Sequence, residues 1–316
     1  MMVLVIKEEF LTKKKMNRIV VTGGLGFIGS SFVHHCVENG HEVMVVDLLT
    51  YAGDYDRMPK SNPLLVQTLI RDICDVTPSD LGEYDYLVNF AAESHVDNSI
   101  ADGRPFVRTN VEGTFNLLEC ARQNPKLKRF VQISTDEVYG DLEKLDNHTA
   151  PSYPYDRLIP SSYYSSTKAA ADLLVQSCAT TFGLPYNITR TCNNFGVRQH
   201  KEKFIPKIIH NIKNDITIPV YGDGKQMREW IWVEDNVKSI LDIMLEGDVN
   251  EIYHIGSDFT TTNIDIINTI GDILGQTPKF EFVEDRLGHD RKYRLHSYNE
   301  TTKTLHEYLR ENLTIS

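Results

Sequence analysis

The sequence of 316 residues has few cysteines and no long apolar run. Its five cysteines, Cys36, Cys74, Cys120, Cys178 and Cys192, form no Cys-x-x-Cys pair, and four of them lie among apolar residues. This pattern indicates reduced core thiols in a cytoplasmic protein and argues against a disulfide framework. No apolar run approaches the roughly 20 residues that a membrane span requires, so we expect no membrane partner.

Basic residues are also in deficit, because 33 lysines and arginines face 44 acidic residues and give a formal net charge of -11. This balance argues against a nucleic-acid partner and leaves any phosphate site to local basic side chains. None of the 11 histidines is spaced with carboxylates or cysteines as in a metal site, so we expect no metal. The hydrophobic content of 41% suits a large domain or two lobes with substantial cores.

A strand, a glycine loop and a helix are expected in succession after residue 17. The apolar run 18–22 leads into Gly23, Gly26 and Gly29, which permit a tight turn, close approach of backbone to a pyrophosphate and close helix packing. The helix N-terminus would supply amide donors to that phosphate. A second apolar strand ends at Asp47, whose carboxylate would accept from the adenosine ribose hydroxyls and repel a 2′-phosphate. These features predict an NAD site.

Strands and helices alternate along the following residues. Further strands are expected at 64–66, 69–74, 86–90, 130–133 and 186–189, and helices at 111–123 and 164–182. This alternation predicts an α/β fold with a Rossmann-type doubly wound parallel sheet and a smaller C-terminal lobe. We expect helices at 237–245 and 264–274 to pack the lobes together. The predicted division is an N-terminal extension at 1–15, an NAD-binding domain at 16–192 to which part of about 222–256 returns, and a sugar-nucleotide lobe at 193–316.

A polar cluster begins where the strand at 130–133 ends. It contains Thr135, Asp136 and Glu137, and it is followed by Tyr164 and Lys168 at the start of a helix. The tyrosine and the lysine are four residues apart and share a helix face, so we expect the ammonium to lower the pKa of the phenol. A tyrosine placed in this way can act as a base. The alternative for Asp136 and Glu137 is a helix cap or a solvated loop.

Several ordered motifs then carry a specific resemblance. They include the segments 47–53 (Asp-Leu-Leu-Thr-Tyr-Ala-Gly), 90–97 (Phe-Ala-Ala-Glu-Ser-His-Val-Asp) and 285–291 (Asp-Arg-Leu-Gly-His-Asp-Arg). From residue 16 to about residue 296 the chain resembles an extended short-chain dehydrogenase/reductase, and within that group the dTDP-glucose 4,6-dehydratase family. The Asp136-Glu137 pair separates it from sugar 4-epimerases, which carry small uncharged residues there, and from decarboxylases, which resemble it with Glu but without the Asp. Asn98 and Leu48 depart from the arginine and lysine usual in the family.

The resemblance implies a reaction in three steps. Tyr164 takes the proton of the glucose 4-hydroxyl while hydride passes from carbon 4 to NAD, with Thr135 bonded to the same oxygen and Lys168 to the nicotinamide ribose. Glu137 then removes the proton of carbon 5 as a protonated Asp136 gives its proton to the departing 6-hydroxyl, and hydride returns to carbon 6. The implied cofactor contacts are Gly23, Gly26, Phe27, Ile28, Gly29, Asp47, Thr50, Asp72, Ile73, Ala91, Ala92, Ser94, Thr109, Tyr164, Lys168 and Asn194. The implied substrate contacts are Ser94, Thr135, Asn193, Lys203, Phe204, Pro219, Tyr221, Arg228, Asn263, Arg286 and His289.

The resemblance also implies a nucleoside-diphosphate glucose substrate, either dTDP-glucose or UDP-glucose, and a homodimer formed through the helices at 111–123 and 164–182. Two alternatives remain open. One is another nucleotide-sugar enzyme of the same superfamily, an epimerase or a decarboxylase. The other is a non-catalytic NAD-binding regulator, although such proteins usually lose the tyrosine or the lysine of the pair.

Overall fold

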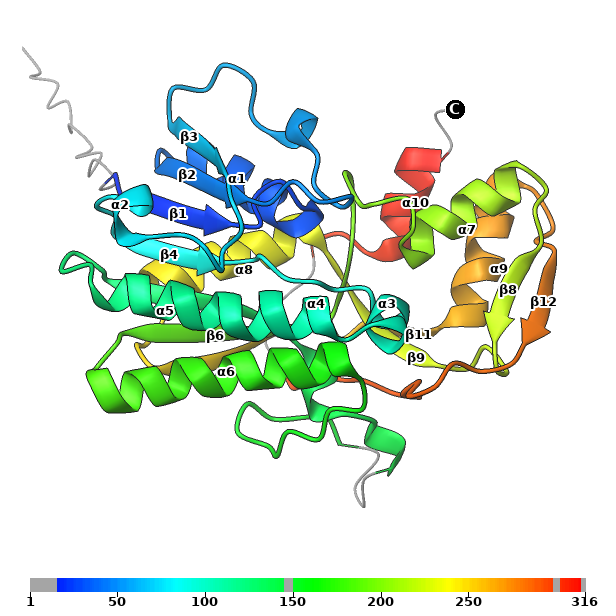
Figure 1. Ribbon diagram of the computed structural model, residues 1–316. Coiled ribbons are helices and arrows are strands. Elements are labelled where there is room, and N and C mark those ends of the chain that lie inside the picture. The colour runs from blue at the N-terminus through cyan, green and yellow to red at the C-terminus, as the bar shows by residue number, and fades with distance from the viewer. Residues whose placement is uncertain (1–15, 145–149, 298–301, 314–316) are drawn as a thin grey trace, which may run out of the picture.

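The computed structural model describes residues 16–144, 150–297 and 302–313. The extension expected at residues 1–15 therefore lies outside the described residues. Within the described part of the chain, none of the helices combines the length and the apolar character needed to cross a membrane. The chain forms a large lobe around a parallel sheet and a smaller lobe that follows it on one side (Figure 1).

The large lobe is built on a seven-stranded sheet in the order β10-β6-β5-β4-β1-β2-β3. Every neighbouring pair in it is parallel. Its strands are β1 (Arg18–Thr22), β2 (Glu42–Asp47), β3 (Leu65–Ile70), β4 (Tyr86–Asn89), β5 (Arg129–Thr135), β6 (Tyr186–Thr191) and β10 (Glu251–Ile255). The strand order reverses at β1 and β4, which opens a crevice beyond their carboxyl ends. The predicted fold class is confirmed.

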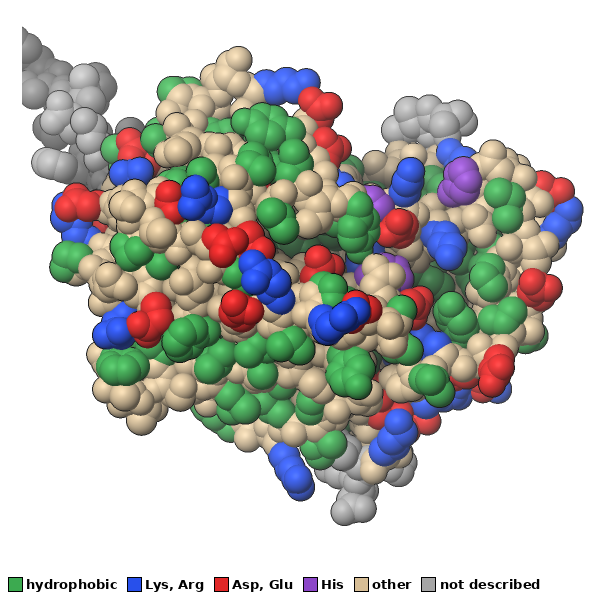
Figure 2. All heavy atoms as spheres, viewed as in Figure 1, with side chains coloured by type: hydrophobic (Ala, Val, Ile, Leu, Met, Phe, Trp, Pro, Cys, Tyr) green, Lys and Arg blue, Asp and Glu red, His purple; other side chains and the backbone are tan. Residues whose placement is uncertain are grey.

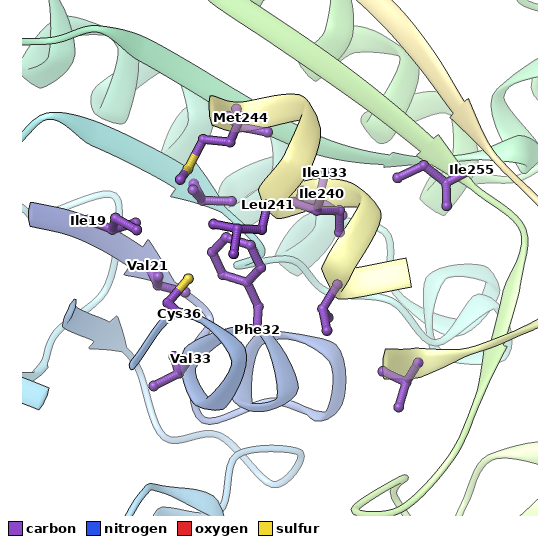
Figure 3. Packing of buried hydrophobic residues seen from close by; sticks show 14 of the residues in the cluster. Ile19, Val21, Phe32, Val33, Cys36, Ile133, Ile240, Leu241, Met244 and Ile255 are labelled. Carbon is purple, nitrogen blue, oxygen red and sulfur yellow. The ribbon is translucent and has the colours of Figure 1, made fainter. Parts of the chain in front are cut away.

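Helices cover both faces of this sheet, which explains why the strands read as unbroken apolar runs. Helices α1 (Phe27–Glu38) and α8 (Val233–Glu246) pack on one face, and α5 (Thr114–Arg122) and α6 (Tyr163–Phe182) cover the other (Figure 1). Along β1, Ile19 and Val21 face the first pair of helices while Val20 faces the second. Figure 3 shows Phe32 of α1 pointing toward Leu241 of α8, so these two helices seal the sheet beside the glycine loop.

Two of the expected elements differ in the structure. The expected strands at 64–66 and 69–74 are one strand, β3, because the exposed Gln67 between them continues the ladder with β2 at the edge of the sheet. The helix expected at 111–123 begins earlier, with a π-helical segment η2 (Val107–Gly113) that runs into α5. A Cβ at Gly113 would lie 2.5 Å from Cδ1 of Ile73, so glycine allows this wide turn to approach the neighbouring loop.

The smaller lobe has its own apolar core. Its elements are β7 (Asn193–Phe195), α7 (Phe204–Lys213), β8 (Ile218–Tyr221), β9 (Met227–Trp232), β11 (Thr260–Thr262), α9 (Asn263–Leu274), β12 (Phe280–Val283) and α10 (Leu305–Leu313). Of the two helices expected to join the lobes, α8 contacts β6 and β10 of the large sheet and also β7 and β9, so that Ile240 shares a core with Ile231 of β9. Helix α9 instead packs within the smaller lobe, where Ile266 belongs to the core.

Short helical segments complete the connections. They are η1 (Tyr55–Arg57), α2 (Pro78–Leu81), α3 (Val96–Ala101), α4 (Arg104–Phe106), η3 (Asp136–Tyr139) and η4 (Leu142–Lys144). Both α3 and η3 follow carboxyl ends of central strands, so they border the crevice between β1 and β4.

Candidate active site

A cleft of about 1630 Å³, part of it open to solvent, lies at the carboxyl ends of the central strands and extends to the smaller lobe. In Figure 2 the surface is hollowed between the two lobes, with acidic, basic and histidine side chains around the hollow. All of the residues expected to contact NAD line this cleft, and so do all five expected catalytic residues. The structure therefore brings together side chains from residue 23 to residue 203.

The glycine loop between β1 and α1 leaves no room for side chains. Gly23 has φ +67, and a Cβ there would lie 2.6 Å from the backbone nitrogen of Ala91. A Cβ at Gly29 would lie 2.2 Å from the carbonyl oxygen of Gly23. Helix α1 has Gly26 at its N-cap, with no side chain capping its first amides. These amides and the bare loop fit a pyrophosphate group at the positive end of the helix dipole.

Asp47 lies beside the glycine loop, at the carboxyl end of β2. Its Oδ2 accepts from the amide of Leu25 at 2.9 Å, and its Oδ1 accepts from the amide of Leu49 at 2.8 Å. Burial raises the pKa of Asp47, and the amide hydrogen bonds oppose that rise. The carboxylate is thus fixed in the cleft as an acceptor, which fits the ribose hydroxyls of a dinucleotide.

Local structure sets the position of the tyrosine and the lysine. Helix α6 begins with a capping box, in which the Oγ of Ser162 accepts from the amide of Ser165 at 3.0 Å. This cap starts the helix at Tyr163, so Tyr164 and Lys168 occupy its first turns and both line the cleft. The Nζ of Lys168 donates to the carbonyl oxygen of Ile133 at 2.5 Å.

The expected effect of Lys168 on Tyr164 is wrong for this arrangement. The pKa of Tyr164 is raised, first by burial and then by the charge of Glu137, while a hydrogen bond with Thr135 lowers it. Burial lowers the pKa of Lys168 to about 8, and Asp172 opposes that fall. The physical reason is that the ammonium is turned to the backbone of β5, whereas Glu137 acts directly on the phenol.

Asp136 and Glu137 stand next to each other in different surroundings. Burial, Glu137 and Glu229 together hold the pKa of Asp136 well above its usual range. Its Oδ1 accepts from the hydroxyl of Thr135 at 3.1 Å, while its buried Oδ2 has no hydrogen-bond partner among the described residues. These surroundings favour the protonated form of Asp136. It does not cap η3, because Thr135 occupies the N-cap and accepts from the amide of Glu137 at 3.3 Å.

Glu137 faces positive charge as well as burial. Burial raises its pKa and Asp290 adds to that rise, while Arg228, Arg286 and Lys203 oppose it. Burial therefore raises the pKa of both carboxyl groups, but the charges that act on Asp136 are mainly acidic and those that act on Glu137 are mainly basic. Such a pair can supply an acid and a base side by side.

The expected substrate contacts divide into two groups. Ser94, Thr135, Asn193 and Lys203 line the cleft, and the Nζ of Lys203 donates to the Oγ of Ser94 at 3.4 Å. The other seven lie on the smaller lobe outside the cleft lining. They are Phe204, Pro219, Tyr221, Arg228, Asn263, Arg286 and His289.

Most of these seven side chains form contacts with other residues of the protein. Arg286 pairs with Asp97 at 3.2 Å, and the guanidinium of Arg228 donates to the carbonyl oxygen of Asp290 at 2.8 Å. His289 bonds Asp285 at 2.6 Å, and its ring meets that of Tyr221 edge-on at 6.2 Å.

The remaining members have structural positions. Phe204 opens α7 and stacks on Trp230 at 6.3 Å, Asn263 opens α9, and Pro219 lies exposed on β8. The structure thus gathers the seven on one lobe, with Arg228 and Arg286 close enough to act on Glu137.

Several residues of the cleft were not anticipated. Glu93 lines it directly after β4, and its pKa is raised by burial and lowered by Lys203. Its place beside Ser94 at the end of a strand was a signal that could have identified it. Gln199 and His200 also line the cleft, from the loop before α7, which carries no such pattern. The ring of His200 meets that of Tyr51 edge-on at 5.8 Å, so two distant loops meet at the rim.

Comparison with known proteins gives consistent similarities. Residues 19–256 match the model of the NAD dependent epimerase/dehydratase family. The chain is 47% identical to the low-salt glycan biosynthesis protein Agl12 of Haloferax volcanii, over 90% of this chain and 91% of that protein. It is 42% identical to the dTDP-glucose 4,6-dehydratase of Neisseria gonorrhoeae, over 89% and 88% of the two chains. The crystal structure of DesIV, a dTDP-glucose 4,6-dehydratase of Streptomyces venezuelae with NAD bound, superposes with a TM-score of 0.87 at 37% identity, covering 94% and 96%.

Proposed function

The chain belongs to the NAD dependent epimerase/dehydratase family, and we propose that this NAD-dependent, nucleotide-sugar modifying enzyme is a glucose-nucleotide 4,6-dehydratase. Its substrate would be dTDP-glucose or UDP-glucose, and its product the 4-keto-6-deoxy sugar nucleotide. The observation that carries this proposal is the carboxyl pair, in which burial and acidic neighbours favour the protonated form of Asp136 beside a Glu137 that faces cations. We assign NAD binding to residues 16–192 with part of 222–256, and sugar-nucleotide binding to 193–316. The return of α8 and β10 to the large sheet supports that division.

The oxidation step draws on the residues at the ends of β5 and α6. Bound NAD would supply the hydride acceptor and a positively charged ring in the cleft. Tyr164 receives the proton of the 4-hydroxyl, and Thr135 shares a hydrogen bond with that tyrosine. Lys168 holds the ribose end of the cofactor through its ammonium. Because the pKa of Tyr164 is raised by burial and by Glu137, its phenolate depends on positive charge gathered in the cleft.

The elimination step draws on the carboxyl pair. A ketone at carbon 4 acidifies the proton of carbon 5, which the ionised Glu137 takes. Asp136 gives its proton to the 6-hydroxyl, which leaves as water, and the hydride then returns to carbon 6 as Glu137 reprotonates carbon 5. A proton then passes from Tyr164 back to Asp136, so that both groups are restored, the sugar nucleotide has lost one water and the cofactor is unchanged. General acid and base assistance of this kind contributes roughly 10²–10⁴-fold each.

Two alternatives make different demands on the same cleft. A 4-epimerase needs the tyrosine and the lysine but has no use for a buried acid at Asp136. A non-catalytic NAD-binding regulator needs neither, whereas Tyr164 and Lys168 both line the cleft here. The carboxyl pair therefore favours the dehydratase over both.

The decisive test is incubation of the purified protein with NAD and either dTDP-glucose or UDP-glucose. We expect the sugar nucleotide to lose the mass of one water and to yield a product that absorbs after treatment with base. Formation of the galactose epimer without loss of mass, or no reaction with either nucleotide, would overturn the proposal. The nucleotide that reacts faster identifies the base recognised by the smaller lobe, where Tyr221, Arg228, Asn263, Arg286 and His289 are our candidate contacts.

We also propose that the chain forms a homodimer through α5 and α6. Phe115 on α5 is 53% exposed and Leu173 on α6 is 56% exposed, and apolar side chains run along both helices in Figure 2. An exposed apolar strip on two adjacent helices favours pairing with a second copy. The proposed location is the cytoplasm, and the free state of all five cysteines fits it.

A further inference from the structure

A buried ion pair lies behind the catalytic lysine, away from the groups that the proposed reaction uses. Asp172 follows Lys168 by one turn of α6, and its side chain has no exposed surface. Its Oδ2 accepts from the Oγ of Ser134 at 2.9 Å and from the Nε of Arg190 at 3.0 Å. Arg190 lies on β6 and is itself only 1% exposed.

The guanidinium of Arg190 is held from its other side as well. Its Nη1 donates to the hydroxyl of Tyr139 at 2.5 Å and to the carbonyl oxygen of Pro154 at 2.8 Å. The Tyr139 hydroxyl lies 2.6 Å from Nε2 of His254, whose Nδ1 lies 3.1 Å from a backbone carbonyl. Burial lowers the pKa of His254 to about 4, so this ring stays neutral and adds no charge. Arg190 is thereby fixed in one orientation, with Asp172 as its carboxylate partner.

Stability alone does not explain a buried ion pair of this kind. Removing two charges from water is costly, and apolar residues of similar volume often stabilise a core as well or better. Asp172 lies at position i+4 from Lys168, so the two side chains project from the same face of α6. The ammonium of Lys168 donates a hydrogen bond to the carbonyl oxygen of Ile133, which is neutral and cannot balance its charge.

We propose that Asp172, paired with Arg190, is a positioning residue that keeps Lys168 charged for its contact with the ribose of the cofactor. This inference rests on the proposed role of Lys168 in binding NAD, and it adds a residue that the proposed reaction does not name. Asp172 does not line the cleft, so it acts through Lys168 and touches no substrate.

The charged groups around Lys168 determine the pH at which its ammonium loses a proton. Asp172 and Tyr164 lie on the same helix as Lys168, Arg190 lies on β6, and Asp136 and Glu137 lie on η3. Among them, Asp172 is the charge that raises the pKa of Lys168 against the effect of burial, which brings it to about 8. The pKa of Tyr164 is raised first by burial and then by the charges of Glu137, Asp136 and Asp172. Loss of the Asp172 charge therefore shifts the titration of Lys168 to lower pH.

The test is the dissociation constant of NAD, measured by calorimetry between pH 6 and pH 10, a range of roughly two pH units either side of the lysine. For the unaltered protein, affinity should fall above about pH 8, where the ammonium is lost. In Asp172→Asn the fall should begin about one pH unit lower, the effect of removing one opposite charge. Affinity at pH 8 would then be about fivefold weaker, because the charged fraction drops from about one half to about one tenth.

Controls separate charge from packing. Ser134→Ala removes a hydrogen bond to Asp172 but keeps the charge of Asp172, so the pH at which half of the NAD affinity is lost should not change. If Asp172→Asn does not fold, the double variant Asp172→Asn with Arg190→Gln removes both charges and should show the same downward shift. A folded variant that binds NAD with an unmoved midpoint overturns the inference while leaving the proposed dehydration intact. A protein that binds NAD as described but removes no water from either glucose nucleotide overturns the proposed function instead.

Discussion

Replacement of Asp136 by asparagine should stop the loss of water without stopping the oxidation of the sugar. The side chain is 3% exposed, and its Oδ2 is buried with no hydrogen-bond partner in the described structure. Asparagine has nearly the same shape but cannot give up a proton at neutral pH. Loss of a general acid costs roughly 10²–10⁴ in rate, which corresponds to about 2.7–5.5 kcal/mol at about 1.36 kcal/mol per tenfold.

The same substitution should cost little stability. The amide nitrogen would replace an oxygen that already lacks a partner, so the usual penalty of about 1–3 kcal/mol for an unsatisfied buried group is largely present in the parent protein. Asp141→Asn provides a matched control. Asp141 is also buried, its Oδ2 has no hydrogen bond although it lies 3.4 Å from Nζ of Lys144, and it lies outside the cleft lining. We expect that control to turn over at the parental rate.

Three measurements on one sample separate the steps of the reaction. With Asp136→Asn we expect the absorbance band of NADH to appear, deuterium from heavy water to enter carbon 5, and the mass of the sugar nucleotide to show no loss of water. Glu137→Gln should also form NADH but should leave carbon 5 unlabelled, because the base is missing. Water loss at the parental rate in a folded Asp136→Asn variant would refute the assignment of this acid.

Other substitutions test the cofactor cradle and the assembly. Gly29→Ala should abolish NAD binding, measured by calorimetry, because its Cβ would lie 2.2 Å from the carbonyl oxygen of Gly23; Gly40→Ala, whose Cβ position is open, should lower only the thermal midpoint. Asp47→Ala should reduce the preference for NAD over NADP by about tenfold, since one lost charge interaction is worth about 1.4 kcal/mol, and an unchanged affinity ratio would contradict its contact with the ribose. Light scattering of the parent protein should give twice the chain mass of 36.1 kDa, and the Leu173→Glu variant should give the mass of one chain. A monomeric parent protein would contradict the proposed dimer.

Local patterns were sufficient to predict the cofactor half of the cleft. The apolar run of β1, the spacing of Gly23, Gly26 and Gly29, and Asp47 at the end of β2 lie within 30 residues, so their relative positions follow from a strand, a turn and a helix. The capped start of α6 likewise places Tyr164 and Lys168 on one face. These features depend on contacts between near neighbours, which the order of the residues dictates.

Longer-range features were not accessible in this way. The raised pKa of Tyr164 depends on burial and on Glu137. The raised pKa of Asp136 depends on burial, on Glu137 and on Glu229, which lies on β9 of the smaller lobe. The engagement of Arg228 with backbone carbonyls was not expected either, because nothing in its neighbouring residues indicates where its guanidinium points.

The chain order alone therefore specified the fold class, and it predicted the glycine loop and the candidate proton-transfer groups, because each is encoded in a short pattern of residue types. The pKa shifts of those groups depend on how the tertiary structure packs around them. Four separate elements carry Asp172, Arg190, Tyr139 and His254, and these elements meet only when the sheet is assembled. The spacing of the four residues in the sequence therefore does not predict that they will be in contact. Protonation depends on burial and on distances between remote charges, and these exist only once the lobes have folded against each other.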